Sequence, residues 1–329
     1  MQAQPIPDRA LATTPRRAGL QLLPFLGKYS IFFSLLIVGV VLTVLTRGLF
    51  ISSNNLTNML VASTDVMIVA TGMTFIIIAG GIDLSVGATA ALAGMICGAV
   101  IKTPGVNVYV GMASALLVGI VVGAINGTLI AYARVPPLIA TLGMLGIGRG
   151  LALAVTGGEP VAALPKELNF LGIGRTFGIP NPIFVAVGVV VIGAFVLRYT
   201  QLGRYTYAIG GNEEAARLSG IPVRRQKLTL YIISGLLAAI AGLVLTGLNL
   251  SASPTNGDLL ELNAIAAVVI GGTSLTGGAG GLIGTIMGAI LTGSLTNGQI
   301  LLGVQSYYSR IVAGVVIVLA VLLDRLRAE

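Results

Sequence analysis

Polar residues that could carry chemistry are few in this sequence, and the first group lies in the segment Gly-Gly-Ile-Asp-Leu-Ser-Val-Gly at positions 80–87. The segment separates two apolar runs and places Asp83 between them. A carboxylate is costly in an apolar environment, so it indicates a functional position on a pathway or in coupling. Asp83 could also cap a helix that begins at Leu84, after a flexible turn at Gly80 and Gly81. The two roles are compatible, and both remain open.

A second Gly-rich segment, residues 271–281, repeats part of this pattern. Residues 271–279 match residues 80–88 at five of nine positions, and both segments lie between apolar runs. Paired, Gly-interrupted segments in repeated halves are typical of transporters and indicate the substrate path. The Gly-Lys-Ser/Thr ending of a phosphate-binding loop is absent, so we do not expect this chain to hydrolyse ATP. The candidate pathway residues in the two segments are Gly80, Gly81, Asp83, Ser85, Gly271, Gly272, Thr273 and Ser274.

The segment 198–227 is the most highly charged part of the chain. Within it, Asn212 can cap a short helix that has Glu213 and Glu214 in its first turn. Gly220 can end that helix. A short amphiphilic helix has no structural role inside a bilayer, and its shape suits a groove in a partner protein. The candidate partner-binding residues are Asn212, Glu213, Glu214, Ala215, Ala216, Arg217 and Gly220.

A third polar group lies at the start of a later apolar run and consists of Asp258, Glu261 and Asn263. The two carboxylates could be helix-start acids, which interact favourably with the positive end of a helix dipole. The three side chains could instead line the outer vestibule of a pathway. The chain has no His and no cluster with metal-ligand spacing, so we predict neither a metal site nor a catalytic residue.

All of these residues are embedded in a strongly apolar chain. Hydrophobic residues make up 55% of the sequence and charged residues only 9%, whereas a soluble domain carries about a quarter charged residues. The 46 glycines suit tightly packed transmembrane helices, where small residues let backbones approach. We therefore expect an all-α integral membrane protein with one transmembrane domain over residues 29–325, between tails at 1–28 and 326–329.

The apolar runs predict about ten transmembrane helices, with eight or nine as alternatives and with some helices discontinuous. Several runs are near the short end of the ~20 residues that a full span needs. The predicted spans cover residues 30–46, 59–79, 84–101, 107–132, 137–155, 181–197, 228–249, 260–276, 281–297 and 309–323.

The basic residues predict how these helices are oriented. With the N-terminal tail in the cytoplasm, most of the 19 Lys and Arg residues fall in cytoplasmic segments, as the positive-inside rule requires. Both termini and the segment 198–227 are then cytoplasmic. This distribution explains the net charge of +8 without a nucleic-acid partner. The segment 156–180 is then external, where it could form a short helix that receives a delivery protein or could be a plain connector.

Three segments resemble those of one protein family. Residues 80–87, 203–221 and 261–275 are similar, in this order, to hallmark segments of the ribose/xylose/arabinose class of bacterial ABC importer permeases. The resemblance covers about residues 30–325 and is closest to ribose permeases. It differs at Asn263, where many relatives have Asp, so it does not imply a required charge at this position.

The resemblance implies how the charged segment works. Glu214, Ala215 and Ala216, followed by Gly220, look like the Glu-Ala-Ala loop with which importer permeases dock on an ATPase subunit. The family is located in the bacterial inner membrane as multi-pass proteins, and it translocates a monosaccharide, such as a pentose, a hexose or a similar polyol, by alternating access. The chain itself then binds no cofactor, and ATP-Mg is bound by the partner ATPase. The other implied partners are a periplasmic sugar-binding protein, a second permease chain, identical or paralogous, and membrane lipid.

An ion-coupled secondary transporter of a small polar solute is the main alternative. It would need ionisable residues at mid-span, and only Asp65 and Asp83 come close. An intramembrane enzyme is a further alternative, but the sequence offers no paired catalytic carboxylates, no His and no nucleophile–base pair. Co-purification with an ATPase would separate the importer from both alternatives.

Overall fold

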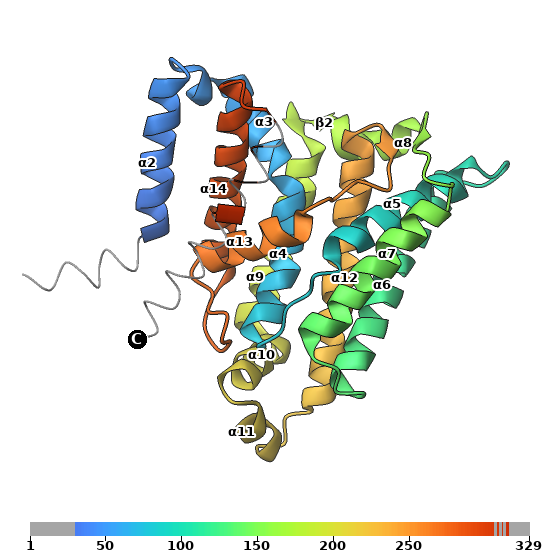
Figure 1. The fold of residues 1–329 in the computed structure, drawn as a ribbon, viewed down its shortest axis with the longest axis vertical. Coiled ribbons are helices and arrows are strands. Elements are labelled where there is room, and N and C mark those ends of the chain that lie inside the picture. Colours follow the sequence, from blue (N-terminus) through green and yellow to red (C-terminus); the bar gives the residue numbers. More distant parts are fainter. Residues whose placement is uncertain (1–29, 306–307, 309–310, 312–313, 316–329) are drawn as a thin grey trace, which may run out of the picture.

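The computed structural model describes residues 30–305, 308, 311, 314 and 315, and this part of the chain is mainly helical (Figure 1). Four of the described helices are long and apolar enough to cross a membrane. A fifth candidate span combines two shorter helices that meet at Ser63 with a bend of 42°. The four long helices are α6 (Val108–Ala131), α7 (Pro137–Ala154), α9 (Asn181–Tyr199) and α12 (Val223–Leu248), and the bent pair is α3 (Ser53–Ala62) and α4 (Thr64–Ile78).

The remaining elements are helices between or beside these spans and four two-residue strands. The strands form two antiparallel pairs, β1 with β4 and β2 with β3. The helices are α2 (Ser30–Leu45), η2 (Leu49–Ile51), α5 (Val86–Lys102), α8 (Lys166–Ile173), α10 (Gln201–Gly211), α11 (Glu213–Leu218), α13 (Leu260–Ile270) and α14 (Leu282–Leu301). The strands are β1 (Val161–Ala162), β2 (Arg175–Thr176), β3 (Ile179–Pro180) and β4 (Ser251–Ala252).

Most predicted spans agree with these helices, but three differ from them. Helix α12 begins at Val223, before the predicted start at residue 228, because its first residues include three basic side chains that lower the hydropathy. The predicted span 59–79 is broken at Ser63. The predicted span 260–276 is helical only as far as Ile270. Gly271 and Gly272 follow, and Gly272 has a φ of 87°, in the left-handed region, which ends the helix. The predicted span 309–323 lies almost entirely outside the described residues, as do the two tails. The count of ten helices and the position of the termini therefore stay predictions.

Helix α4 lies at the centre of the molecule, between α9, α12 and α13 (Figure 1). Every residue of α4 except Asp65 is buried. A helix that is apolar around its whole circumference has no face for water and is covered either by lipid or by other helices, and here other helices cover α4. Helix α4 thus fixes the place of the Gly80–Ser85 segment, which follows it directly.

Helices α6 and α12 pack unusually closely because glycine forms part of their contact. A Cβ atom added to Gly119 would collide with the carbonyl oxygen of Gly235, and one added to Gly235 would collide with the carbonyl oxygen of Gly119. Small residues on facing helices allow this approach in membrane proteins. The contact holds α12 beside α6 and brings the α12 side chains Tyr231 and Ser234 close to the segment after α4.

Candidate functional site

The charged segment forms two short helices, α10 and α11, at one end of the molecule, which we call the α11 end (Figure 1). Helix α8 and strand β2 lie at the other end (Figure 1). The structure contains the short helix that the sequence predicts. The Asn212 side chain accepts a hydrogen bond from the backbone N–H of Ala215 at 2.9 Å and so caps α11. Gly220 ends the turn after α11 with a φ of 82°.

Helix α11 presents most of its surface to solvent. Ala216 is its one buried residue, and the side chain of Leu218 is 74% exposed. Glu214 pairs with Arg217 on the same helix at 2.5 Å, and Glu213 pairs with Lys227 of α12 at 2.7 Å. The hydrogen bonds from Arg217 hold the pKa of Glu214 below its ordinary value.

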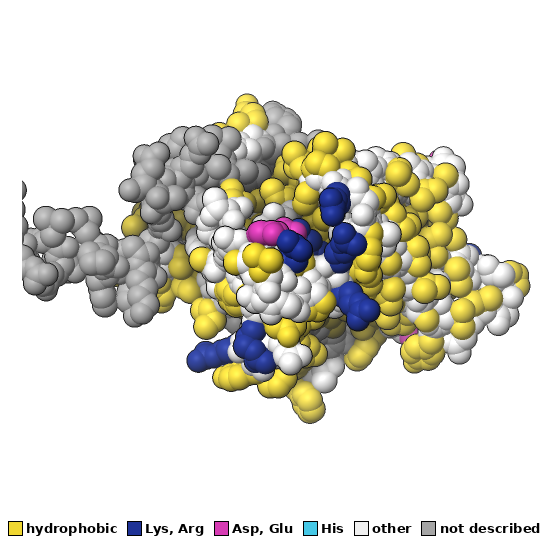
Figure 2. Space-filling view, turned by 90° about the horizontal axis from the view of Figure 1, so that it is seen from below, with side chains coloured by type: hydrophobic (Ala, Val, Ile, Leu, Met, Phe, Trp, Pro, Cys, Tyr) yellow, Lys and Arg dark blue, Asp and Glu magenta, His cyan; other side chains and the backbone are white. Residues whose placement is uncertain are grey.

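A hollow of about 670 Å³ lies beside α11 and is lined by charged side chains from three elements. Arg134, Arg224 and Lys227 line it together with Glu213 and Glu214. Figure 2 shows the basic side chains gathered around the acidic pair on this face. The exposed helix and the charged hollow together form a surface that can receive a partner protein.

The last turn of α10 packs directly against both Gly-rich segments. The backbone N–H of Gly278 donates a hydrogen bond to the carbonyl oxygen of Ile78 at 2.9 Å, which joins the second segment to the end of α4, directly before the first segment. Gly210 lies against the same two groups, because an added Cβ would collide with the Ile78 oxygen and approach the Gly278 nitrogen to 2.5 Å. The Tyr207 hydroxyl donates a hydrogen bond to the carbonyl oxygen of Gly280 at 2.8 Å. The helix that precedes α11 therefore contacts both breaks.

The first break, between α4 and α5, is organised around the buried side chain of Asp83. One carboxylate oxygen accepts hydrogen bonds from the backbone N–H of Ser85 at 3.0 Å and from its hydroxyl at 2.6 Å. The other accepts a hydrogen bond from the Ser234 hydroxyl of α12 at 2.8 Å. The Asn126 amide of α6 donates a hydrogen bond to the Ser85 hydroxyl at 2.9 Å. Asp83 thus connects the break to α12 directly and to α6 through Ser85.

The expectation that Asp83 caps a helix beginning at Leu84 is wrong in its position. Helix α5 begins at Val86, with Ser85 as the residue before it. The reason is that the Asp83 side chain binds Ser85 and Ser234, so Leu84 and Ser85 form a turn instead of the first helical residues. The carboxylate still stabilises the start of the helix, but it does so through the preceding turn.

Replacing Asp83 with alanine should destabilise the protein strongly, because three buried hydrogen-bond donors would lose their acceptor. Each unsatisfied buried donor costs about 1–3 kcal/mol. We expect the midpoint of thermal unfolding in detergent to fall most for Asp83→Ala, less for Asp83→Asn and least for Ser234→Ala. An Asp83→Ala protein that unfolds at the wild-type temperature would contradict this role.

The second break, between α13 and α14, is built from glycines and local hydroxyl contacts instead of a buried carboxylate. Gly272, Gly277 and Gly278 all have positive φ angles, which glycine adopts without strain. The Ser274 hydroxyl lies 2.8 Å from that of Thr276, and the Ser274 N–H donates a hydrogen bond to the carbonyl of Ala279 at 3.1 Å. The Thr273 hydroxyl is buried and has no hydrogen-bond partner among the described residues. The sequence repeat therefore corresponds to two helix breaks that touch each other.

The third polar group lies at the start of α13, at a distance from the breaks along the chain. Glu261 is in the first turn of α13, as a helix-start acid would be. Its side chain is buried against Gly87 of α5, and its Oε2 atom has no hydrogen-bond partner in the described part of the chain. Asn263 is half-buried two residues further on. An outer vestibule at these residues stays a prediction.

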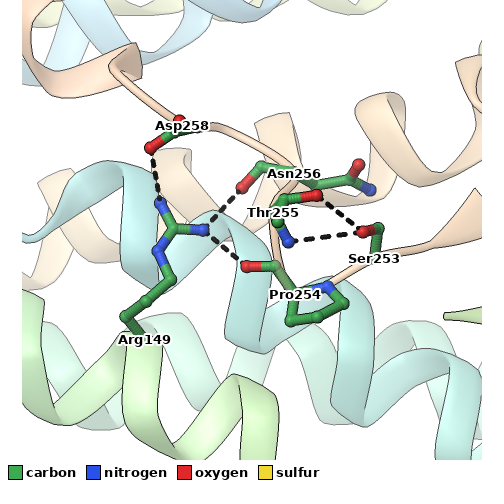
Figure 3. A network of polar contacts seen from close by, with 6 residues as sticks. All are labelled: Arg149, Ser253, Pro254, Thr255, Asn256 and Asp258. Carbon is green, nitrogen blue, oxygen red and sulfur yellow. Dashed lines mark hydrogen bonds and ion pairs between the residues drawn. The ribbon is translucent and has the colours of Figure 1, made fainter. Parts of the chain in front are cut away.

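Arg149 of α7 organises the segment before α13, and sequence reasoning missed it. Its guanidinium donates hydrogen bonds to the carbonyl oxygens of Pro254 at 2.6 Å and Asn256 at 3.2 Å, and it lies 3.9 Å from the carboxylate of Asp258 (Figure 3). We call residues 249–259 the crossover segment. A single arginine within an apolar run of spanning length is the signal that could have identified this residue.

Comparison with known proteins identifies the family. Residues 55–321 match the family model described as "Branched-chain amino acid transport system / permease component". The chain belongs to this family. It is 46% identical to the ribose import permease protein of Escherichia coli strain K12 over 280 residues, which are 84% of this chain and 87% of that protein. The comparison with solved structures found no match.

Other permeases are similar over even more of the chain. The ribose import permease protein of Bacillus subtilis strain 168 is 44% identical over 296 residues, which are 89% of this chain and 91% of that protein. The L-arabinose ABC transporter permease protein of Azospirillum brasilense is 36% identical over 327 residues, 99% of this chain and 95% of that protein. The residues matched by the family model include the segments 80–87, 198–227 and 258–263.

Proposed function

We propose that this chain is the permease subunit of an ATP-driven importer that translocates a monosaccharide across the bacterial inner membrane. The observation that carries this function is the 46% identity to a ribose import permease over most of both chains. The similar proteins are named for different sugars, ribose and L-arabinose among them. The description of the family model names branched-chain amino acids instead. We assign the sugar class because several sugar permeases match nearly the whole chain.

The proposed partners follow from the surfaces of the molecule. Helix α11, with its exposed Glu214–Arg217 pair, suits the groove of an ATPase subunit, which would bind ATP-Mg. A periplasmic sugar-binding protein would dock at the opposite end, near α8. A second permease chain, identical or paralogous, would complete the translocation path. In this orientation both termini lie in the cytoplasm.

The proposed mechanism is alternating access driven from the α11 end. When the ATPase dimer closes, it moves α11, and α10 transmits this displacement to the two breaks. The transmission depends on contacts between backbones, because Gly210 touches Ile78 and Gly278 without an intervening side chain. Packed backbone groups cannot yield by changing rotamers, so a displacement of α10 must move the breaks as well. Helices α5 and α14, which begin at the breaks, would then open or close the path.

The coupling role of α11 can be tested with the double variant Glu214→Ala/Gly220→Ala. The first change removes the pair with Arg217, and the second places a side chain at a φ of 82°. We expect uptake of labelled sugar and sugar-stimulated ATP hydrolysis to fall roughly tenfold, as for residues central to a docking surface, while the amount of protein in the membrane is unchanged. Val44→Ala on α2 truncates an exposed apolar side chain that lies on neither α8 nor α11, and it serves as the control. Unchanged uptake by the double variant would refute the coupling role.

The substrate and the energy source can be tested together. Labelled pentoses and hexoses should enter a strain that carries the chain only when the ATPase subunit is also present. Uptake that continues without any ATPase subunit and depends on an ion gradient would instead support an ion-coupled transporter.

A further inference from the structure

A second hollow, of about 500 Å³, lies where α9 ends, α10 crosses and α14 begins. Its walls are apolar and include Ala194, Leu197, Leu282 and Ile283. Arg198 and Arg204 also line it, whereas no acidic residue does. Its volume is within the range of sites for small molecules. The hollow lies outside the charged surface beside α11 and shares none of its lining residues.

The two arginines of this hollow are not neutralised by nearby carboxylates, in contrast to two basic residues of the surface beside α11. Arg217 and Lys227 are paired with glutamates. Arg198 lies over the ring of Tyr199 at 5.6 Å, and in the described part of the chain neither Arg198 nor Arg204 has an ion-pair partner. Two uncompensated guanidinium groups attract an anion, and phosphate oxygens fit their planar donor geometry.

The backbone of the hollow adds further donors. Residues Gly281 to Gly284 line it, and α14 begins at Leu282 without a side-chain cap. Within the described residues, the N–H groups of Leu282 and Ile283 have no backbone acceptor. An added Cβ at Gly281 would meet no atom within 4 Å, so the space before the helix is open. The helix start therefore strengthens the preference of the two arginines for an anionic group.

Apolar side chains continue from the hollow along the outer surface of the helices. The exposed fractions are 65% for Ile192 and 59% for Phe195 on α9, and 79% for Ile283 on α14. In a membrane protein, such side chains face acyl chains. A free anion would use only the charged end of this surface, whereas a phospholipid would use both the charged end and the apolar one.

We propose that this hollow binds the headgroup of an anionic phospholipid, with its acyl chains along α9 and the start of α14. Basic pockets between transmembrane helices bind anionic headgroups on the cytoplasmic side. That this hollow lies on the cytoplasmic side of the membrane rests on the proposed function, but the binding of a lipid to it does not. Tyr207 and Gly280 are in the lining, and the hydrogen bond between them joins α10 to the second break. A bound lipid would therefore stabilise the contact that couples α10 to the path.

The binding can be measured on the purified, delipidated full chain in detergent, titrated with phosphatidylglycerol or phosphatidylcholine. We expect tight binding of phosphatidylglycerol only, and roughly thirtyfold weaker binding to Arg198→Gln/Arg204→Gln, as expected for the loss of two basic residues at a lipid headgroup. Arg134→Gln/Arg225→Gln removes the same charge at the same end but outside the hollow, and it should bind like the wild type. Arg198→Lys/Arg204→Lys keeps the charge but not the planar donor geometry, so it should bind more weakly than the wild type and more tightly than the Gln variant.

Three results would overturn the proposal. The first is equal binding of the two lipids, and the second is unchanged phosphatidylglycerol binding by the Gln variant. The third is displacement of the lipid by millimolar inorganic phosphate, which would show a site for a free anion. If binding follows the prediction but sugar uptake in liposomes does not depend on phosphatidylglycerol, the stabilising effect on coupling is refuted. These results are independent of which sugar is transported, so they do not depend on the proposed substrate.

Discussion

Gly210→Ala should uncouple ATP hydrolysis from transport, although it adds only one methyl group at the end of α10. The new Cβ would collide with the carbonyl oxygen of Ile78 and lie 2.5 Å from the nitrogen of Gly278. Both neighbours are backbone atoms, so the clash cannot be relieved by a side-chain rotation. Either α10 or the two breaks must move, and overpacking of this kind costs about 1–3 kcal/mol.

The adjacent Gly211 provides a closely matched control. An added Cβ at Gly211 would meet no atom within 4 Å, so Gly211→Ala makes the same chemical change in the same helix without a clash. Alanine also has a higher helix propensity than glycine, so this variant should be as stable as the wild type or slightly more stable.

The comparison should use the assembled importer in liposomes, with sugar uptake and ATP hydrolysis measured in parallel. We expect sugar uptake by Gly210→Ala to be lower than that of the wild type by roughly tenfold or more, because a free-energy cost of about 1.4 kcal/mol corresponds to a factor of ten. The variant should still bind the ATPase through its intact α11, so ATP hydrolysis should continue without transport. Gly211→Ala should transport like the wild type. If the two variants transport equally well, the proposed transmission through Gly210 is wrong.

Helix α11 could be predicted from the sequence because all of its signals are local. The Asn212 cap, the two acidic residues in the first turn and the glycine at Gly220 lie within nine residues of one another. Each acts on the backbone of its immediate neighbours, so no knowledge of the tertiary structure is needed. The two breaks were predictable for the same reason, because glycine pairs interrupt apolar runs.

Contacts between distant segments were not predictable from local patterns. The approach of Gly210 to Ile78 and Gly278 depends on how α10 folds back against the breaks, and no spacing within the sequence encodes it. The length of α13 was overestimated because hydropathy continues beyond Ile270, whereas the backbone turns at Gly272. Hydropathy measures the preference of side chains for lipid and contains no information about φ angles.

The crossover segment is held in place by long-range contacts at both ends, and Arg149 provides those at its C-terminal end. Strand β4 pairs with β1, with Ala252 opposite Val161. Leu250 and Leu259 have φ angles of 54° and 63°, which are unfavourable for leucine. Such conformations persist only where surrounding contacts impose them. Arg149 supplies two hydrogen bonds and an ion pair to this segment, so we expect the segment to loosen when Arg149 is replaced (Figure 3).

Arg149→Ala should therefore lower the free energy of unfolding by about 2–4 kcal/mol, since hydrogen bonds to a charged group are worth about 1.5–3 kcal/mol and their acceptors would remain buried. Asp258→Asn should cost less than about 1 kcal/mol, because that side chain is 50% exposed and lies 3.9 Å from Arg149. Arg149→Lys keeps the charge but cannot reproduce the planar donor geometry, so it should fall between these two.

Limited proteolysis would localise the effect. In Arg149→Ala, cleavage within residues 249–259 should become faster than in the wild type, because the carbonyl groups of Pro254 and Asn256 are released. Arg175→Ala also removes an arginine, but one whose hydrogen bond reaches only Gly178 in the adjacent turn, so its cleavage pattern should be unchanged. If Arg149→Ala and Arg175→Ala are equally resistant at the crossover segment, Arg149 does not hold it, and the β1–β4 pair alone must be sufficient.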